Sequence, residues 1–175
     1  KSASTFAIRI PSWSKTLYIL HKNIQNEILN EYNQINIKES QNFEDGYMYL
    51  QVSKGDNICI KLDESPYFVY PSPKIPDLCG QIAVCKGPLV YCAESVDNKN
   101  EILNLSIDEN QFKNEKKQYN DKDGFIEIKA FRQEIPDDLY SQKEPEYSLQ
   151  SIKMIPYYKW ANRGISQMKI WFPKK

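Results

Sequence analysis

Aromatic and polar side chains gather in one short segment near the end of this sequence. Between residues 156 and 164 the segment contains Tyr157, Tyr158, Trp160, Asn162 and Arg163. Tyrosine and tryptophan rings offer large apolar faces with a polar tip, and such faces can stack on sugar rings. Amide and guanidinium groups beside them can hydrogen-bond to hydroxyls. The segment is therefore a candidate contact surface for a glycan or for another domain.

The same segment also has a purely structural interpretation, which the residue types favour. Buried tyrosine and tryptophan rings usually satisfy their polar tips with nearby partners. Arg163 could pair with the carboxylate of Glu94, which ends an expected strand at residues 91–94. We therefore expect a structural ion pair between Glu94 and Arg163, and we keep the contact surface as the alternative.

Adjacent carboxylates are the other candidates for chemistry. Hydrolysis of a glycosidic bond needs two carboxylates roughly 5–10 Å apart. The adjacent pairs are Glu44–Asp45, Asp63–Glu64 and Asp137–Asp138. All three fall at strand ends or in loops, where neighbouring acids are usually solvated turn residues. Asp121 and Asp123 form an oxygen-rich turn that lacks the terminal glutamate of an EF-hand loop, so a plain turn is favoured over a calcium site.

Histidine and cysteine chemistry is poorly supported. His21 is the single histidine and has no marked nucleophile near it, and no glycine-rich phosphate loop is present. The four cysteines, Cys59, Cys79, Cys85 and Cys92, match no zinc spacing. Cys59 and Cys85 are predicted to be buried as small hydrophobic residues, with a disulfide as the alternative. We expect no catalytic, cofactor-binding or metal-binding residue, and unpaired thiols favour a cytoplasmic location.

Composition excludes further classes. The chain has 175 residues, and its 23 basic residues balance its 23 acidic residues. A nucleic-acid binder or a binder of anionic membranes needs a positive field, so neither partner is expected. No apolar run approaches the roughly 18 residues of a membrane-spanning helix.

Alternation of apolar and polar residues with a period of two dominates the chain, as expected for strands. It predicts an all-β fold, namely an antiparallel β-sandwich of jelly-roll-like form. Residues 47–52 and 58–62 are predicted to form a hairpin around Gly55. Near-continuous apolar runs at residues 82–85 and 89–92 indicate strands that are buried on both faces. Residues 95–124 are either a surface excursion or a frayed pair of short strands.

Two lobes are predicted. Residues 65–76 contain four prolines, which cannot lie in a central strand, and we interpret them as an extended connector. The first lobe, residues 1–72, begins within a strand pattern and is expected to lack its earlier strands. The second lobe, residues 73–175, is expected to be a second β-sandwich domain.

Three segments together resemble glycoside hydrolase family 127, the β-L-arabinofuranosidase family. They are residues 8–13 (IRIPSW), residues 80–94 (GQIAVCKGPLVYCAE) and residues 155–168 (IPYYKWANRGISQM). The order and spacing of the three segments agree with the family across nearly the whole chain. The chain departs from the family pattern after residue 13, where no Asn-Gly turn follows.

The resemblance implies the C-terminal part of such an enzyme. In that family an N-terminal (α/α)6 barrel carries the cysteine nucleophile, a zinc ion and sugar-binding histidines, and β-sandwich domains follow. None of these roles maps onto a residue of this chain. The resemblance therefore implies a non-catalytic portion that packs on the barrel of the same parent chain or on a second subunit. A carbohydrate-binding module for oligosaccharides and a dimerising or purely structural sandwich remain the alternatives.

Overall fold

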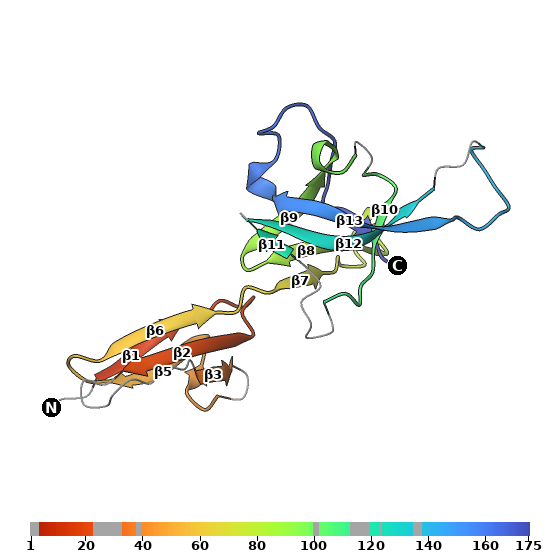
Figure 1. Ribbon diagram of the computed structural model, residues 1–175. Coiled ribbons are helices and arrows are strands. Elements are labelled where there is room, and N and C mark those ends of the chain that lie inside the picture. Colours follow the sequence, from red (N-terminus) through yellow and green to blue (C-terminus); the bar gives the residue numbers. More distant parts are fainter. Residues whose placement is uncertain are drawn as a thin grey trace. The chain divides into compact units, whose positions relative to one another are not determined.

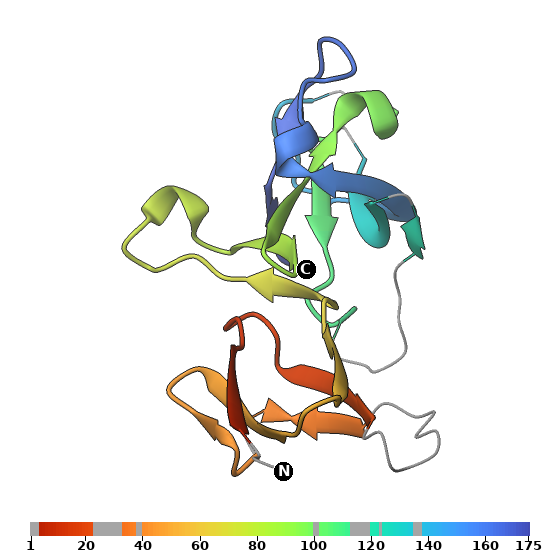
Figure 2. The ribbon, with the colours of Figure 1, turned by 90° about the vertical axis from the view of Figure 1, so that its left-hand side faces the viewer.

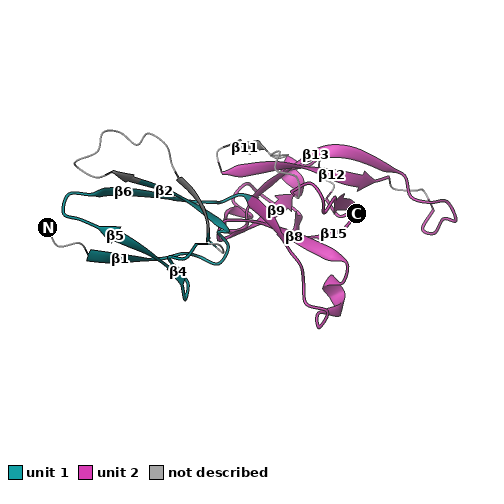
Figure 3. Cartoon of the chain, turned by 90° about the horizontal axis from the view of Figure 1, so that it is seen from below, with its two compact units in different colours: residues 1–65 teal, residues 66–175 magenta. Residues whose placement is uncertain are grey.

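The chain folds into two compact units, residues 1–65 and residues 66–175 (Figure 3). The computed structural model describes residues 4–22, 33–37, 40–99, 102–112, 120–122, 124–134 and 138–175. All named strand pairs among them are antiparallel, which confirms the predicted all-β fold. Within the described residues, no helix has the length and apolar character needed to cross a membrane.

Unit 1 is a sandwich of two three-stranded sheets (Figure 2). The order β1-β5-β4 forms one sheet, from Ser4–Arg9, Tyr47–Val52 and Phe43–Glu44. The order β3-β2-β6 forms the other, from Asn33–Asn36, Thr16–Lys22 and Asn57–Leu62. Alternation along these strands directs one set of apolar side chains inwards, and the buried ones are Ile10, Leu17, Ile19, Ile37 and Met48.

The hairpin predicted for residues 47–62 is wrong, because β5 and β6 belong to opposite sheets. A tight turn joins them, in which the Asp56 N–H donates to the Ser53 carbonyl at 3.0 Å and Gly55 takes a φ of 91°. The chain crosses the core at this turn. Side chains of both strands, such as Met48 and Ile60, pack in one core cluster. The two strands therefore face each other across the core.

Unit 2 contains one nine-stranded sheet (Figure 1). Its main path runs β10-β12-β13-β9-β8-β15, and β7, β11 and β14 add to it at β8, β12 and β9. The strands are β7 (Pro66–Val69), β8 (Gln81–Lys86), β9 (Leu89–Glu94), β10 (Leu105–Ile107), β11 (Asn120–Lys122), β12 (Phe125–Gln133), β13 (Tyr147–Pro156), β14 (Met168–Lys169) and β15 (Trp171–Pro173).

The two ends of this path meet. The Lys175 N–H donates to the Ile107 carbonyl at 3.0 Å, and Ile107 forms an isolated bridge with Lys174. The sheet therefore curls until β10 lies beside the segment that follows β15. One apolar core fills the interior, with Phe172, Met154 and Ile82 fully buried in it. Unit 2 therefore encloses its core with one curled sheet, where the sequence predicted a second β-sandwich of two sheets.

The proline-rich connector contributes a strand to unit 2. Pro66–Val69 pairs with β8, from Pro66 opposite Lys86 to Val69 opposite Ala83. Among the described residues it pairs with β8 alone, and Pro66 stands at its first position, where a strand tolerates proline. The two units therefore divide between Ser65 and Pro66, ahead of the boundary between residues 72 and 73 that the sequence suggested.

The strands β8 and β9 form a tight hairpin in which Cys85 lies opposite Val90 and Lys86 opposite Leu89. Gly87 occupies the turn with a φ of 54°. Ile82 to Cys85 and Tyr91 to Glu94 are buried without alternation. This confirms the prediction of burial on both faces for residues 82–85, whereas in the run at residues 89–92 only Tyr91 and Cys92 are buried, and Leu89 and Val90 are exposed.

The four cysteines are free thiols that differ in exposure. Cys85 and Cys92 are buried, whereas Cys59 and Cys79 are exposed. The prediction that Cys59 is buried is wrong, because it lies between Ile58 and Ile60 on β6 and so points to the opposite face. Burial, with a smaller contribution from Glu94, raises the pKa of the Cys92 thiol to about 11.

The raised pKa of Cys92 predicts a loss of stability at high pH. An unfolded thiol ionises near its ordinary value of 9.0, so unfolding releases a proton between about pH 9 and pH 11. The free energy of unfolding is therefore expected to fall through that range, by roughly 1–2 kcal/mol at pH 10.5. Urea unfolding at pH 8.5 and 10.5 measures the fall, which should be smaller in Cys92→Ala. Equal falls in both proteins would contradict the prediction.

Candidate functional site

The aromatic and polar segment follows the end of β13 in unit 2. Pro156 ends the strand, and a short 3-10 helix, η4 (Tyr157–Lys159), begins directly after it. The Trp160 N–H donates to the Tyr157 carbonyl at 3.0 Å, which closes this turn. The chain then forms a loop through residues 161–167 before β14 begins. We call residues 157–164 the aromatic loop.

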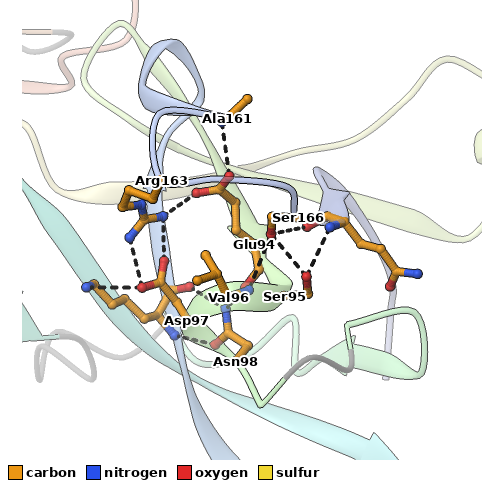
Figure 4. Close-up of polar contacts among 10 residues, drawn as sticks. Glu94, Ser95, Val96, Asp97, Asn98, Ala161, Arg163 and Ser166 are labelled. Carbon is orange, nitrogen blue, oxygen red and sulfur yellow. Dashed lines mark hydrogen bonds and ion pairs between the residues drawn. The ribbon is translucent and has the colours of Figure 1, made fainter.

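The side chain of Glu94 binds the aromatic loop at two points. It is the last residue of β9 and its side chain is fully buried. One carboxylate oxygen accepts a hydrogen bond from the Ala161 N–H at 3.1 Å, and the other forms an ion pair with the Arg163 guanidinium (Figure 4). The structure thus brings together the two residues that the sequence suggested as ion partners.

Asp97 is a second carboxylate on the same guanidinium. It lies in η3 (Ser95–Asp97), one turn beyond Glu94. Arg163 Nη1 donates to Asp97 Oδ1 at 2.8 Å, and Nη2 lies 2.6 Å from Oδ2. Hydrogen bonding to Asp97 is the largest cause that raises the pKa of Arg163, and hydrogen bonding to Glu94 adds to it while burial opposes both. Lys153 Nζ lies 3.4 Å from Asp97 Oδ1.

Neutral side chains tie the same two segments together. Ser95 Oγ lies 3.0 Å from Ser166 Oγ and accepts from the Gln167 N–H at 3.0 Å. Asn98 donates to the Glu94 carbonyl at 2.8 Å and accepts from the Lys153 N–H at 2.9 Å. Figure 4 shows these contacts beside the ion pair. The segment 94–98 and the loop after β13 are therefore fixed to each other at several points.

The backbone of the aromatic loop adopts unusual conformations. Ala161 has a φ of 63° and Gly164 a φ of 101°. A side chain makes a positive φ costly for alanine, and such conformations persist where surrounding contacts enforce them. The hydrogen bond from Ala161 to the buried Glu94 is such a contact.

The aromatic rings of the loop remain accessible. Tyr157 and Trp160 have nearly parallel rings, with 12° between their planes and 6.1 Å between their centroids. Their exposed fractions are 43% and 41%, and that of Tyr158 is 66%. Lys159 Nζ lies over the Phe125 ring at 5.4 Å. The contacts described above thus fix the backbone of the loop, while its three rings stay partly exposed.

Sequence reasoning missed several members of this site. Asp97, Ser95 and Asn98 lie within four residues of Glu94, so spacing alone could have suggested that a tight turn places them beside it. The sequence gives no comparable indication that Ser166 or the backbone of Ala161 belongs to the site. Their roles depend on how the loop returns to β9, which alternation does not encode.

The adjacent acids form no paired site among the described residues. Asp63 accepts from the N–H and the hydroxyl of Ser65 at 3.0 and 2.6 Å, which is the turn role expected of it. Asp45 is a turn residue with a φ of 49°. Asp137 and Asp123 lie outside the described residues, so the pair at 137–138 and the turn at 121–123 are not placed.

The chemistry available to the cluster is limited. Both Glu94 and Asp97 are engaged by Arg163, so neither carboxylate is placed to exchange protons with a substrate. No group of three or more histidine, cysteine, aspartate or glutamate side chains suited to a metal occurs in the described part of the chain. A pocket of about 240 Å³ in unit 2 is lined by residues that include Asn104, Ser106 and Tyr147, and no carboxylate lines it.

Known proteins match this chain over nearly its whole length. Residues 66–173 match the family described as the glycoside hydrolase family 127 C-terminal domain. The non-reducing end β-L-arabinofuranosidase of Bifidobacterium longum is 30% identical over 181 aligned positions, which cover 97% of this chain and 26% of that protein.

Solved structures agree. The family 127 β-L-arabinofuranosidase Ara127N of Geobacillus stearothermophilus superposes with a TM-score of 0.74 at 25% identity, over 100% of this chain and 27% of that one. A second β-arabinofuranosidase of family 127 gives a TM-score of 0.68 at 21% identity, over 100% and 28%. This chain therefore spans about a quarter of the length of the relatives it matches.

Proposed function

The chain belongs to glycoside hydrolase family 127, and we propose that its two units form a non-catalytic β-structure of a larger glycosidase. In this proposal the aromatic loop is the face that contacts the (α/α)6 catalytic barrel or a second subunit. The parent reaction is hydrolysis of terminal β-L-arabinofuranosyl bonds, as in the Bifidobacterium longum relative.

One observation carries this proposal: both carboxylates of the cluster, Glu94 and Asp97, are bound by partners within the chain. Glu94 is fully buried and bound to Arg163 and to the Ala161 N–H. A glycosidase needs two carboxylates that can reach a sugar. Accessible apolar rings above a fixed polar base suit a contact surface instead, because buried cores of interfaces are enriched in tyrosine, tryptophan and arginine.

The zinc ion that the family implies does not fit the described residues, which bring no three histidine, cysteine, aspartate or glutamate side chains together around a metal. A cysteine that binds zinc does so as a thiolate, whereas burial raises the pKa of both Cys85 and Cys92 and so favours the protonated thiol. Cys59 belongs to unit 1 and the other three cysteines to unit 2. We assign zinc chemistry to the remainder of the enzyme and derive no step from it here.

The purified 175-residue chain is expected to show no turnover. An aryl β-L-arabinofuranoside releases a coloured phenol when it is hydrolysed, so absorbance measures the rate. The rate with this chain should equal the buffer blank, because no carboxylate pair reaches the surface of the cluster. The Bifidobacterium longum relative at equal concentration provides the positive control. Turnover well above the blank would overturn the non-catalytic assignment.

Glycan binding is the second candidate function, and the near-parallel rings of Tyr157 and Trp160 favour it. Both rings are partly exposed, and aromatic rings can stack on sugars. Titration calorimetry with arabinan-type oligosaccharides tests this directly. Binding that disappears in Trp160→Ala, but persists in Tyr140→Ala at another exposed tyrosine, would support it. No heat signal in the unmodified chain would remove this candidate.

A dimerising role is tested by sedimentation. If the aromatic loop contacts a second copy, the sedimentation coefficient should rise with protein concentration, and Tyr158→Ser should reduce that rise because Tyr158 is the most exposed ring of the loop. A coefficient that stays constant with concentration would leave the barrel as the proposed partner.

A further inference from the structure

The pocket of unit 2 lies where the two ends of the curled sheet meet. β10 and the segment after β15 come together at the bridge between Ile107 and Lys174, and residues of both segments line a hollow of about 240 Å³. Pockets for drug-sized ligands measure roughly 300–1,000 Å³, so this one suits a smaller molecule. None of its lining residues belongs to the aromatic loop, so it is a separate candidate site.

Three lysines give this pocket a positive charge. Lys174 and Lys175 are lining residues. Lys169 lies against the same wall, because its Nζ donates to the carbonyls of two lining residues, Leu103 at 2.7 Å and Leu105 at 3.1 Å. Such a cluster attracts an anion to the pocket.

Aromatic rings hold one of these cations in place. Lys175 Nζ lies over the ring of Tyr147, which lines the pocket, and over the ring of Phe131 at 5.4 Å. The faces of aromatic rings attract an ammonium group. The Lys175 charge is therefore positioned at the pocket before any ligand arrives.

Carboxylates offset this charge only in part. Glu109 pairs with Lys174 at 3.3 Å, and no acidic residue is among the described residues that line the pocket. Glu134 and Glu146 adjoin two lining residues and remain in register, since the Glu134 N–H donates to the Glu146 carbonyl at 2.9 Å. Alternation along the strands directs their side chains to the opposite face.

Polar groups for a neutral part of a ligand lie in the same wall. Gln133 and the buried Ser106 contribute an amide and a hydroxyl, and both groups can hydrogen-bond to ligand hydroxyls. Asn104 has a fixed orientation, because Arg132 Nη1 donates to its Oδ1 at 3.1 Å and its Nδ2 donates to the Gln133 carbonyl at 2.8 Å. The buried Arg132 thus places a further cation behind the lining.

We propose that this pocket binds a sugar acid, either free or as the terminal unit of an oligosaccharide. Lys174 and Lys175 bind its carboxylate, and Gln133 and Ser106 bind its hydroxyls. A neutral sugar would make no charge-assisted hydrogen bond to the lysines, and a simple carboxylate would not use the amide and the hydroxyl. This site lies outside the aromatic loop and does not depend on the role proposed for that loop.

Titration calorimetry at low ionic strength tests the ligand class with three probes. D-glucuronate contains both a carboxylate and a hydroxylated ring, D-glucose contains the ring alone, and acetate contains the carboxylate alone. Glucuronate should bind at least about tenfold more tightly than either of the others. A lack of glucuronate binding, or equal affinity for glucose or acetate, would overturn the proposal.

Two variants locate the binding in this pocket. Lys174→Met should weaken glucuronate binding about tenfold, because it removes a cation from the lining. Gln133→Leu keeps both lysines and should reduce the preference for glucuronate over acetate. Undiminished affinity in Lys174→Met, in a protein that still unfolds cooperatively, would contradict the assignment, as would an unchanged preference in Gln133→Leu.

Two control variants lie outside the pocket. Lys143→Met removes an exposed lysine of unit 2, and Trp160→Ala alters the aromatic loop, so neither should change glucuronate affinity. A loss in Trp160→Ala without a loss in Lys174→Met would place the ligand on the aromatic loop and overturn the proposal.

An oligosaccharide that ends in glucuronate distinguishes the two sources of the ligand. Affinity equal to or above that of free glucuronate supports a chain end, because the pocket then accepts the acid while the rest of the chain stays outside. Binding of free glucuronate alone supports a free sugar acid. If Lys174→Met weakens neither complex, the pocket is not their binding site.

Discussion

Replacing Arg163 with methionine is expected to lower the free energy of unfolding of unit 2 by about 3 kcal/mol. Arg163 is the cation between two carboxylates, and the Glu94 side chain is fully buried. Methionine preserves much of the apolar stem but leaves the Glu94 charge without its ion partner. Urea unfolding followed through tryptophan fluorescence measures the loss as a lower midpoint.

The control for Arg163→Met is Lys174→Met, which removes an ion pair from an exposed position. Lys174 Nζ lies 3.3 Å from Glu109, and its side chain is 46% exposed. Exposed pairs contribute about 0–1 kcal/mol, so this variant should barely move the midpoint. Equal losses in the two variants would show that burial of Glu94 does not govern the energy of the cluster.

A second variant tests the same reasoning from the other side. In Glu94→Met combined with Arg163→Met, the buried Glu94 charge is gone and Asp97 keeps its ion pair with Lys153. Replacing both members of a buried pair with apolar residues is often close to neutral. We expect the double variant to recover most of the stability that Arg163→Met loses. A loss equal to the sum of the single losses would mean that the two side chains act independently.

The part of this architecture that the sequence predicts best is the part that the local residue pattern determines. The apolar runs of β8 and β9 indicate strands buried on both faces, and Ile82 to Cys85 are buried without a gap. Gly87 supplies the positive φ of the turn between them. Residue type, strand length and turn chemistry agree here, so the prediction needed no tertiary information.

The failures share a different cause. β5 and β6 have the alternation and the glycine turn of a hairpin, yet they pair with strands of opposite sheets. Alternation shows which face of each strand is apolar, but it does not show whether the two faces lie in one sheet or oppose each other across a core. The exposure of Cys59 follows from the same ambiguity, because its phase on β6 depends on which face meets the core.

The sequence predicted the candidate site only in part. Complementary charge suggested Glu94 as the partner of Arg163, and the structure joins them across 69 positions of sequence. Asp97 was missed, although Arg163 Nη1 donates to its Oδ1 and Arg163 Nη2 forms an ion pair with its Oδ2. One carboxylate satisfies the charge of an arginine, so sequence gives no reason to seek a second until the 3-10 turn after β9 is known.

Replacing Phe172 with alanine is expected to destabilise unit 2 by about 3–5 kcal/mol. Phe172 is fully buried in the core and lies on β15, opposite Ile82 of β8. Its strand leads directly into the contact between Lys175 and Ile107 that joins the ends of the curled sheet. The cavity left by the ring would therefore open where the sheet closes, and urea unfolding measures the loss.

Leu139→Ala is the matched control, because it also shortens an apolar side chain in unit 2. Leu139 is 95% exposed, and surface changes of this kind usually stay within about 0.5 kcal/mol. A large difference between the two variants follows if β15 and β8 enclose one core together with β12 and β13. A loss below about 1 kcal/mol in Phe172→Ala would mean that the sheet remains stable without its last strand, and closure would then contribute little to the fold.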